Sequence, residues 1–264
     1  MQIHLINLAR RPDRLAAMEE RVRALGLILD RTEAIDAGAA DPALLDRWFE
    51  DRGPLGEIPR GDKACFLSHR AAWQRFVESG DAHAAFLEDD VWLTASAAML
   101  LGHDGWIPAD VAVVKLEHYG PSSQRVLLTG LRAVAPGFRM GRMLSRHTGA
   151  AAYILSRAAA EILLAQARFD LPVDHLLFNP NNSRLFARLP PWQLLPAIAR
   201  QEQFIGARAA ETSDIERTRK DLRAFSPTYV KRELTRFAYD LRLIPCQVAA
   251  LIGGAKFMKV QTKA

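Results

Sequence analysis

The stretch that decides the fold is residues 3–35, IHLINLARRPDRLAAMEERVRALGLILDRTEAI. Its first six residues are mostly apolar and predict a short buried strand. Pro12 stands where a helix begins and Gly26 where it stops. Between them, the apolar residues at helical spacing are Leu15, Met18, Val22 and Leu25. Residues 27–35 are apolar enough for a second strand. This strand–helix–strand order predicts a parallel sheet with helices on its faces.

The rest of the chain continues the alternation of strands and helices. We expect further strands at 84–87, 111–116, 126–134 and 151–155, and helices near 44–49, at 61–79 and at 157–167. With 264 residues, of which 49% are apolar, the chain suits one large α/β domain with a small appendage. Disordered, collagen-like and coiled-coil classes do not fit this composition.

Basic charge is concentrated in the last fifth of the chain. The net charge is +5, but residues 215–264 hold 11 Lys and Arg against four acids, or +7. Residues 1–214 hold 24 basic and 26 acidic residues, or −2. A nucleic-acid enzyme spreads basic charge around its working cleft, so we expect no nucleic-acid partner. We divide the chain into a domain at 1–214 and a basic tail at 215–264.

Other classes are disfavoured by what the sequence lacks. Cys65 and Cys246 are 181 residues apart and no other Cys flanks them, so we expect neither a disulfide framework nor a zinc site built on Cys residues. The chain contains no GxGxxG or GxxxxGK[ST] loop and no GxSxG elbow. Neither a signal peptide at the start nor a run of 18 apolar residues is visible, so we expect a cytoplasmic protein.

The residues with the clearest chemical potential are Glu88, Asp89 and Asp90, directly after the apolar strand 84–87. Three acids at the carboxyl end of a buried strand are costly unless a cation offsets them, and ligands of open α/β sheets bind at that edge. In an extended segment Glu88 and Asp90 face the same way, which suits Mg²⁺ or Mn²⁺. The alternative is an acidic turn that caps the next element.

Two further segments are candidates for ligand contacts. Residues 7–14 join the first strand to a helix start with three arginines, where a phosphate would bind, although a solvated basic helix start fits equally. In residues 61–69, Ser68 and His69 are adjacent on a helix and point apart, which argues against a hydrolase dyad. His118, His147 and His175 are scattered singly.

The tail contains a basic amphipathic helix at 229–244. Its apolar residues at 4-3-4-3 spacing are Val230, Leu234, Phe237, Leu241 and Ile244. This pattern fits a helix on an anionic membrane surface, and equally a helix packed against its own domain.

Several motifs in fixed order resemble glycosyltransferase family 25, the lipooligosaccharide and lipopolysaccharide glycosyltransferases related to collagen galactosyltransferases. The motifs are Ile6-Asn7-Leu8 with Arg11 and Asp13-Arg14, Ala34-Ile35-Asp36, Ala64-Cys65-Phe66-Leu67-Ser68-His69 with Trp73, Leu87-Glu88-Asp89-Asp90-Val91, Val114-Lys115-Leu116, His147-Thr148-Gly149 with Tyr153-Ile154-Leu155-Ser156, Pro172-Val173-Asp174, and Ser213-Asp214-Ile215. The resemblance runs from about residue 3 to about residue 215. Its most specific parts are the LEDDV and CFLSH blocks.

The resemblance implies a GT-A type, Rossmann-like nucleotide-sugar fold with a mixed sheet and flanking helices. It implies a UDP-sugar donor, most often UDP-galactose, a glycan acceptor, and inversion to a β-linkage. A divalent metal, Mn²⁺ or Mg²⁺, would be held by Asp90 with Glu88 and stabilise the leaving UDP. The residues that it implies around the nucleotide sugar are Asn7, Arg11, Arg14, Asp36, Lys63, Ser68, His69, Glu88 and Asp89.

Inversion also needs a general base beside the acceptor hydroxyl. By role, we expect Asp174, in a loop-like segment, with Glu117 as the alternative, and His147 as a metal or phosphate contact. The sequence departs from the family pattern at Asp36-Ala37-Gly38 and at Gly61-Asp62-Lys63.

The function expected from the sequence is therefore transfer of a hexose to a lipid-linked lipopolysaccharide-type glycan, at the inner face of the cytoplasmic membrane. One rival is a non-catalytic descendant that binds a sugar or a partner. A metal-dependent phosphohydrolase is the other, but the sequence offers no further cluster of ligands for it.

Overall fold

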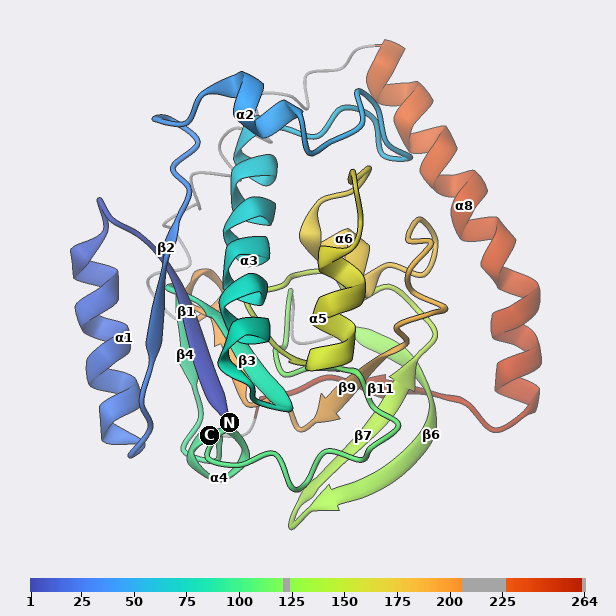
Figure 1. The fold of residues 1–264 in the computed structure, drawn as a ribbon. Coiled ribbons are helices and arrows are strands. Elements are labelled where there is room, and N and C mark those ends of the chain that lie inside the picture. The colour runs from blue at the N-terminus through green and yellow to red at the C-terminus, as the bar shows by residue number, and fades with distance from the viewer. Residues whose placement is uncertain (121–123, 206–226, 263–264) are drawn as a thin grey trace.

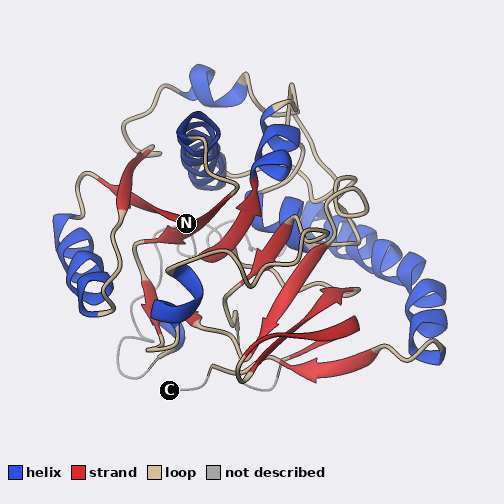
Figure 2. Cartoon of the chain, turned by 60° about the horizontal axis from the view of Figure 1, so that its bottom comes forward, coloured by secondary structure: helices blue, strands red, loops and turns tan. Residues whose placement is uncertain are grey.

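The computed structural model describes residues 1–120, 124–205 and 227–262. Its centre is a nine-stranded mixed sheet with the strand order β11-β6-β7-β9-β5-β8-β3-β1-β2 (Figures 1 and 2). The strands are β1 (Gln2–Leu8), β2 (Asp30–Ala34), β3 (His83–Glu88), β5 (Val113–Lys115), β6 (Arg125–Ala135), β7 (Phe138–Met143), β8 (Ala152–Ser156), β9 (Pro191–Leu195) and β11 (Lys256–Lys259). The expected α/β class with a mixed sheet and flanking helices is confirmed.

One end of the sheet is parallel, as the opening stretch predicts. Strand β1 pairs in parallel with both β2 and β3, so the carboxyl ends of the three strands meet at one edge. Helix α1 (Pro12–Ala24) begins at a proline in its first turn, and the chain leaves it through Gly26 at φ +69°. Helix α3 (Arg60–Ser79) follows β2 and packs against β1, β2 and β3.

The other end of the sheet is mostly antiparallel. Strand β8 runs antiparallel between β3 and β5, and β9 is parallel to β5 but antiparallel to β7. The hairpin of β6 and β7 follows, and β11 closes the sheet beside β6. The contact between α3 and α5 (Arg157–Leu164) places both helices on one face of the sheet (Figure 1).

Smaller elements complete the fold around two apolar clusters. Strands β4 (Val91–Leu93) and β10 (Ala199–Gln201) form an antiparallel pair that lies next to the end of β3. The short helices are α2 (Pro42–Asp46), α4 (Ala97–Leu101), α6 (Val173–Phe178) and the 3₁₀ turn η1 (Glu202–Phe204). One cluster, around Trp73, Phe86 and Tyr153, lies between the sheet and α3; another surrounds Leu87 and Leu100.

The amphipathic helix expected at 229–244 lies within α8 (Pro227–Ile252). Gln247 of α8 donates a hydrogen bond to the carbonyl of Leu144, and Asn181 donates one to Asp240. Beyond α8, the chain returns to the sheet as β11. The end of the predicted tail is therefore part of the sheet, whereas the boundary predicted at 214/215 lies outside the described residues.

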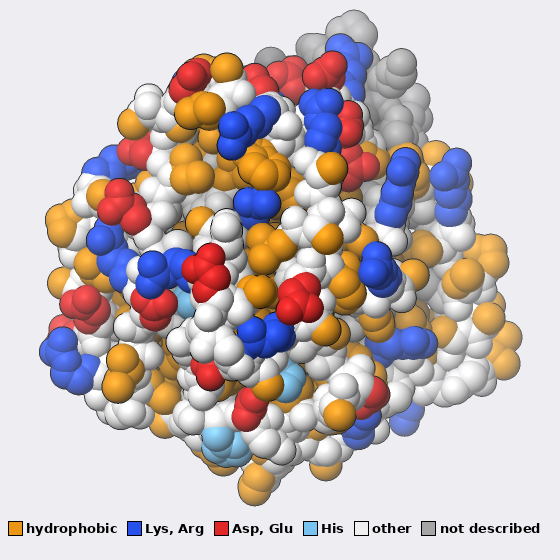
Figure 3. All heavy atoms as spheres, in the orientation of Figure 1, with side chains coloured by type: hydrophobic (Ala, Val, Ile, Leu, Met, Phe, Trp, Pro, Cys, Tyr) orange, Lys and Arg blue, Asp and Glu red, His pale blue; other side chains and the backbone are white. Residues whose placement is uncertain are grey.

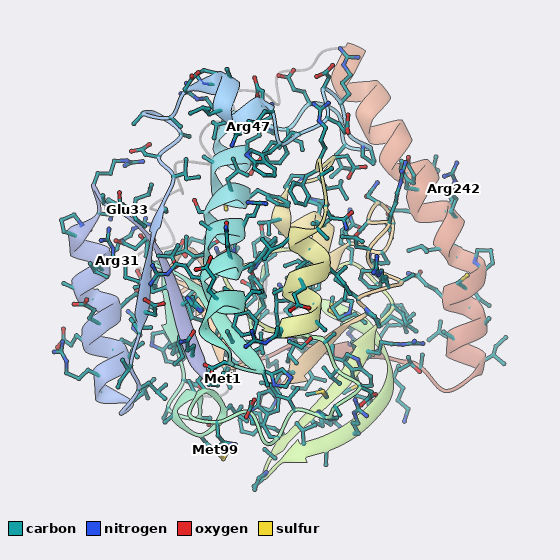
Figure 4. All side chains as sticks on the ribbon, in the orientation of Figure 1. Met1, Arg31, Glu33, Arg47, Met99 and Arg242 are labelled. Atoms are coloured by element: carbon teal, nitrogen blue, oxygen red, sulfur yellow. The ribbon has the colours of Figure 1, made fainter. Side chains whose placement is uncertain are left out.

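The outer side of α8 is apolar. Its exposed apolar side chains are Phe237, Leu241, Ile244, Val248, Leu251 and Ile252. Figure 3 shows hydrophobic side chains and Lys or Arg together along the edge where Figure 1 places α8, and Figure 4 labels Arg242 on the same helix. No helix in the described part of the chain is both long and apolar enough to span a bilayer.

Candidate functional site

A pocket of about 580 Å³ opens at the edge where β1, β2 and β3 end. Its walls come from the ends of these strands, from the loop after β2, and from the first turns of α3. The charged residues in the walls are Arg10, Arg14, Arg60, Asp36, Glu88, Asp89 and Asp90. This size and position are typical of a small-molecule site in an open α/β sheet, and the start of α3 favours an anionic group.

The acidic triplet has three different environments. The Asp89 carboxylate accepts hydrogen bonds from Asn7 Nδ2 (2.8 Å) and Arg14 Nη1 (3.0 Å). Glu88 Oε1 lies 3.2 Å from His69 Nε2 and 3.9 Å from Cys65 Sγ. Because β3 ends at Glu88 and the chain then turns, the expectation of an extended segment is wrong, although Glu88 and Asp90 both line the pocket.

Asp90 is the member of the triplet whose charge is poorly compensated. Its Oδ1 is buried and has no hydrogen-bond partner among the described residues. Burial, and next the negative charge of Glu88, raise the pKa of Asp90 to about 8. Glu117 Oε2 is also buried and unpartnered within the described structure. Of these two residues only Asp90 lines the pocket, and its orphaned oxygen fits a site for a cation.

A second group of charges lies behind the pocket, around Lys115. Both Lys115 and Glu117 are fully buried, and Lys115 Nζ lies 2.6 Å from Glu117 Oε1. Lys115 also donates to the carbonyl of Gly149 and lies 4.2 Å from the centre of the Phe178 ring. Burial lowers the pKa of Lys115 and raises that of Glu117, while their mutual attraction opposes both shifts.

Asp174 is near this group but is only partly buried. It lies in the first turn of α6 rather than in a loop, which corrects the sequence interpretation of this segment. Its carboxylate accepts hydrogen bonds from the backbone N–H groups of His175 (2.9 Å) and Gly149 (3.4 Å). Gly149 has φ +88°, and a Cβ there would lie 2.5 Å from the Tyr119 ring, so only glycine fits.

His147 is enclosed by protein groups. Its Nδ1 lies 2.8 Å from Gln193 Oε1, and its Nε2 lies 3.3 Å from both the backbone N and the carbonyl O of Tyr119. Burial lowers the pKa of His147 to about 3. In this arrangement both ring nitrogens have protein partners, and the residue does not line the pocket.

The structure brings together most of the residues expected around the donor. The predicted residues that line the pocket are Arg14, Asp36, Ser68, His69, Glu88, Asp89 and Asp90. Asn7 lies behind the wall and orients Asp89. Arg11 forms an ion pair with Asp13, and Lys63 forms one with Asp46; neither side chain lines the pocket.

Arg10 is one of the three arginines expected to contact a phosphate, whereas Arg60 and Gln201 were not expected from the sequence. Arg10 and Arg60 line the pocket, and Arg10 Nε donates to Asp36 Oδ2 at 2.6 Å. A hydrogen bond from the Gly38 amide and the Arg10 guanidinium lower the pKa of Asp36. Gln201 Nε2 lies 3.4 Å from Glu88 Oε2. The three arginines in residues 7–14 indicated Arg10 as a candidate. No motif near Gln201 indicated that its side chain contacts Glu88.

The sequence did not indicate that Cys65 lies beside two other residues that could bind a metal. Within the described part of the chain, the ligand atoms of Cys65, His69 and Glu88 lie within 4.8 Å of one another. Neither cysteine is in a disulfide. Counting cysteines alone does not detect such a group, because the other two ligands come from His and Glu.

The fold and the pocket define an α/β protein with a charged pocket at the carboxyl ends of parallel strands. The chain belongs to Glycosyltransferase family 25 (LPS biosynthesis protein), whose family model matches residues 1–177, and it is therefore a glycosyltransferase.

Similar proteins agree with this assignment. The chain is 29% identical over 217 residues to the lacto-N-neotetraose biosynthesis glycosyltransferase LgtB of Neisseria meningitidis, covering 76% of this chain and 75% of that protein. The LgtB of Neisseria gonorrhoeae is 30% identical over the same shares of both chains. The lipooligosaccharide biosynthesis protein lex-1 of Haemophilus influenzae is 28% identical over 70% of this chain and 64% of that protein.

A solved structure of a glycosyltransferase involved in the glycosylation of the major capsid of PBCV-1 covers 83% of this chain and 98% of its own, with a TM-score of 0.42 and 11% identity.

Proposed function

We propose that this glycosyltransferase moves a hexose, galactose, from UDP-galactose to a lipopolysaccharide or lipooligosaccharide glycan, with inversion to a β-linkage. Family membership and the biosynthetic roles for which LgtB and lex-1 are named support the class of acceptor. The donor and the inversion follow from the resemblance to family 25. The observation that carries the proposal is the pocket at the ends of β1, β2 and β3.

The charges of the pocket favour a nucleotide diphosphate bound together with a cation. Its walls carry three arginines and four carboxylates, so a cation held by the carboxylates would add the positive charge that attracts a diphosphate. Arg14 and the start of α3 are suited to contact phosphate oxygens. The apolar walls, including Ile6, Leu8 and Ile35, offer a surface for the base.

Asp90 and Glu88 would hold Mn²⁺ or Mg²⁺. The orphaned Oδ1 of Asp90 fits this assignment, since such ions are commonly bound by one or two carboxylates and substrate phosphates. When bound, the ion supplies stabilisation of the negative charge that develops on the departing UDP.

Asp174 is the better candidate for the general base. It is partly exposed at the start of α6, whereas Glu117 is fully buried and held by Lys115. A group that accepts the proton of an acceptor hydroxyl has to touch that hydroxyl. Asp174 would take this proton as the sugar is attacked on the face opposite the leaving diphosphate.

The acceptor is attached to lipid, and α8 would hold the enzyme at the inner face of the cytoplasmic membrane. The exposed apolar side chains of α8 and its basic residues match an anionic lipid surface. Deleting the tail would also remove β11 from the sheet, so substitutions test this better. Phe237→Ser with Leu241→Ser should reduce sedimentation with anionic vesicles, whereas Ile28→Ser, at an exposed apolar residue elsewhere, should not. Unchanged sedimentation of the α8 variant would contradict this role.

The transferase reaction itself is tested by a donor screen. The purified protein is incubated with Mn²⁺, a panel of UDP-sugars and a lipooligosaccharide acceptor, and UDP release is measured with and without EDTA. We expect UDP-galactose to give the fastest release and EDTA to suppress it. Equal release with every donor, or release that is independent of metal, would contradict the proposed donor or the role of the metal. Asp174→Asn should abolish transfer but leave UDP binding intact.

A further inference from the structure

The side chains of Cys65, His69 and Glu88 form a ligand set that differs from the acidic site. Cys65 and His69 are four residues apart and therefore lie on the same face of α3, and Glu88 ends the neighbouring strand β3. Glu88 Oε1 lies 3.2 Å from His69 Nε2 and 3.9 Å from Cys65 Sγ. Tetrahedral zinc with ordinary bond lengths places its N and O ligands about 3.3 Å apart and its S and O ligands about 3.5 Å apart. The two separations from Glu88 thus need only small shifts, and the ligand atoms of all three residues lie within 4.8 Å of one another.

The imidazole of His69 is held in place by a further set of contacts. Its Nδ1 lies 2.8 Å from the hydroxyl of the buried Tyr153, which in turn accepts a hydrogen bond from Trp73 Nε1 at 2.7 Å. A metal-binding histidine commonly donates its other ring N–H to an oxygen that fixes its orientation. Tyr153 provides that oxygen, and it leaves Nε2 directed toward Glu88.

Access and ligand type indicate which ion would bind. All three residues line the 580 Å³ pocket, so an ion can enter from solvent and keep one position open for water or a ligand. Thiolate and imidazole favour Zn²⁺ over Mg²⁺ or Mn²⁺, which prefer oxygen ligands. We propose that Cys65, His69 and Glu88 form a second metal site, which binds Zn²⁺ in the wall of the pocket.

Zinc in this site has a consequence for catalysis. It engages the carboxylate of Glu88 and occupies part of the pocket wall, so it competes with productive binding of the donor and its metal. This consequence, unlike zinc binding itself, rests on the proposed function. Binding replaces the thiol proton of Cys65 with the metal and releases that proton to solvent.

Cobalt spectroscopy tests the site without any substrate. Co²⁺ is titrated into reduced, metal-free protein, and we expect a sulfur-to-cobalt charge-transfer band with the visible bands of tetrahedral cobalt. Added Zn²⁺ should abolish both. Cys65→Ser should lose the charge-transfer band, and Cys246→Ser, at the other and exposed cysteine, should retain it. Circular dichroism checks that each variant is folded.

The outcomes separate the alternatives. If wild type shows no charge-transfer band, or if Cys65→Ser retains it, Cys65 is not a ligand and the three side chains form only a hydrogen-bonded group. His69→Gln should weaken Co²⁺ binding at least about tenfold, as loss of an orienting group alone already costs 10–100-fold in other sites. Zn²⁺ should then inhibit UDP release by wild type and Cys246→Ser more than by Cys65→Ser. Cobalt bands without that inhibition would leave the site standing and overturn only its effect on the donor.

Discussion

Two groups of charged residues lie at the ends of β5 and β3, the strands that flank β8, and they are neutralised in different ways. On β5 and just after it, Lys115 and Glu117 form an ion pair that is closed to solvent. At the end of β3 and just after it are the carboxylates of Glu88, Asp89 and Asp90. The first group, the closed pair, contains its own cation. In the second, the open group of these three acids, the guanidinium of Arg14 contacts Asp89, whereas Oδ1 of Asp90 has no hydrogen-bond partner among the described residues. Buried carboxylates need a partner, so the second group is where an external cation is expected.

The largest expected effect comes from breaking the closed pair. Lys115→Met leaves Glu117 buried without its cation, and should reduce the free energy of unfolding by about 3–5 kcal/mol. Urea denaturation measures this change. Lys63→Met, at the surface pair with Asp46, should cost less than about 1 kcal/mol.

A double variant shows whether the loss is due to the unpaired charge. Lys115→Met with Glu117→Leu replaces the pair with apolar side chains and should recover most of the stability, as in other buried pairs. A double variant no more stable than Lys115→Met would mean that Lys115 stabilises the fold through Gly149 or Phe178 instead.

Replacing Asp90, in the open group, should have the opposite effect on stability. Burial and Glu88 raise the pKa of this carboxyl to about 8, so keeping it protonated in the folded state costs stability at neutral pH. Asp90→Asn removes that cost, so the metal-free variant should be at least as stable as wild type. Its turnover should fall by about 10²–10³-fold, the usual cost of losing one group that stabilises developing charge. Turnover is followed by UDP release and stability by urea denaturation. Asp110→Asn, at a surface pair with Arg132, is the matched control and should change neither. Retained turnover would remove Asp90 from the site.

The comparison also shows what a sequence can predict. The strands and helices of residues 3–35 follow from local apolar spacing and from Pro12 and Gly26, and the parallel edge then places residues 84–90 beside β1. Pairing between distant segments, such as β11 with β6, has no local signal. For the same reason the three consecutive acids were easy to recognise in the sequence. The residues that contact each of them could not be predicted, because they come from distant segments.

Side-chain direction was the harder part of the site to predict. Arg11 and Arg14 belong to one basic stretch, yet Arg14 reaches Asp89 and Arg11 pairs with Asp13. The sequence placed Lys115 in the strand predicted at 111–116 but did not indicate that Glu117 is its ion-pair partner. The structure shows this pair, because it buries both side chains with 2.6 Å between Lys115 Nζ and Glu117 Oε1. Tertiary packing decides these contacts, because it fixes which side of each element is covered.

The two arginines provide a smaller test of the open group. Arg14→Ala should raise the KM for the UDP-sugar about tenfold, the effect of losing one charge-assisted phosphate contact of about 1.4 kcal/mol. Arg11→Ala is expected to leave that KM unchanged, since its partner lies outside the pocket. Steady-state kinetics with varied donor measure both. Equal effects of the two substitutions would mean that the donor draws Arg11 into the pocket.

The smallest effect concerns a buried titratable group outside both sets of charges. His4 lies in the middle of β1, fully buried, with its ring stacked on Phe86 at 5.4 Å between centroids. Burial lowers the pKa of His4, and Asp30, 3.4 Å from its Nδ1, opposes this only in part. The folded state therefore keeps His4 neutral while the unfolded chain takes up a proton below about pH 6.5.

Because the unfolded state binds more protons, stability is full above about pH 6.5 and is lost as the pH falls toward the lowered pKa, by at most about 1.4 kcal/mol per pH unit. His4→Phe should remove this loss and retain the stacking on Phe86, so its free energy of unfolding should fall less between about pH 7 and about pH 5.5. Urea denaturation across this range measures the difference, with His103→Gln as the control at an exposed histidine. If His4→Phe and wild type lose stability equally over this range, the loss comes from other groups.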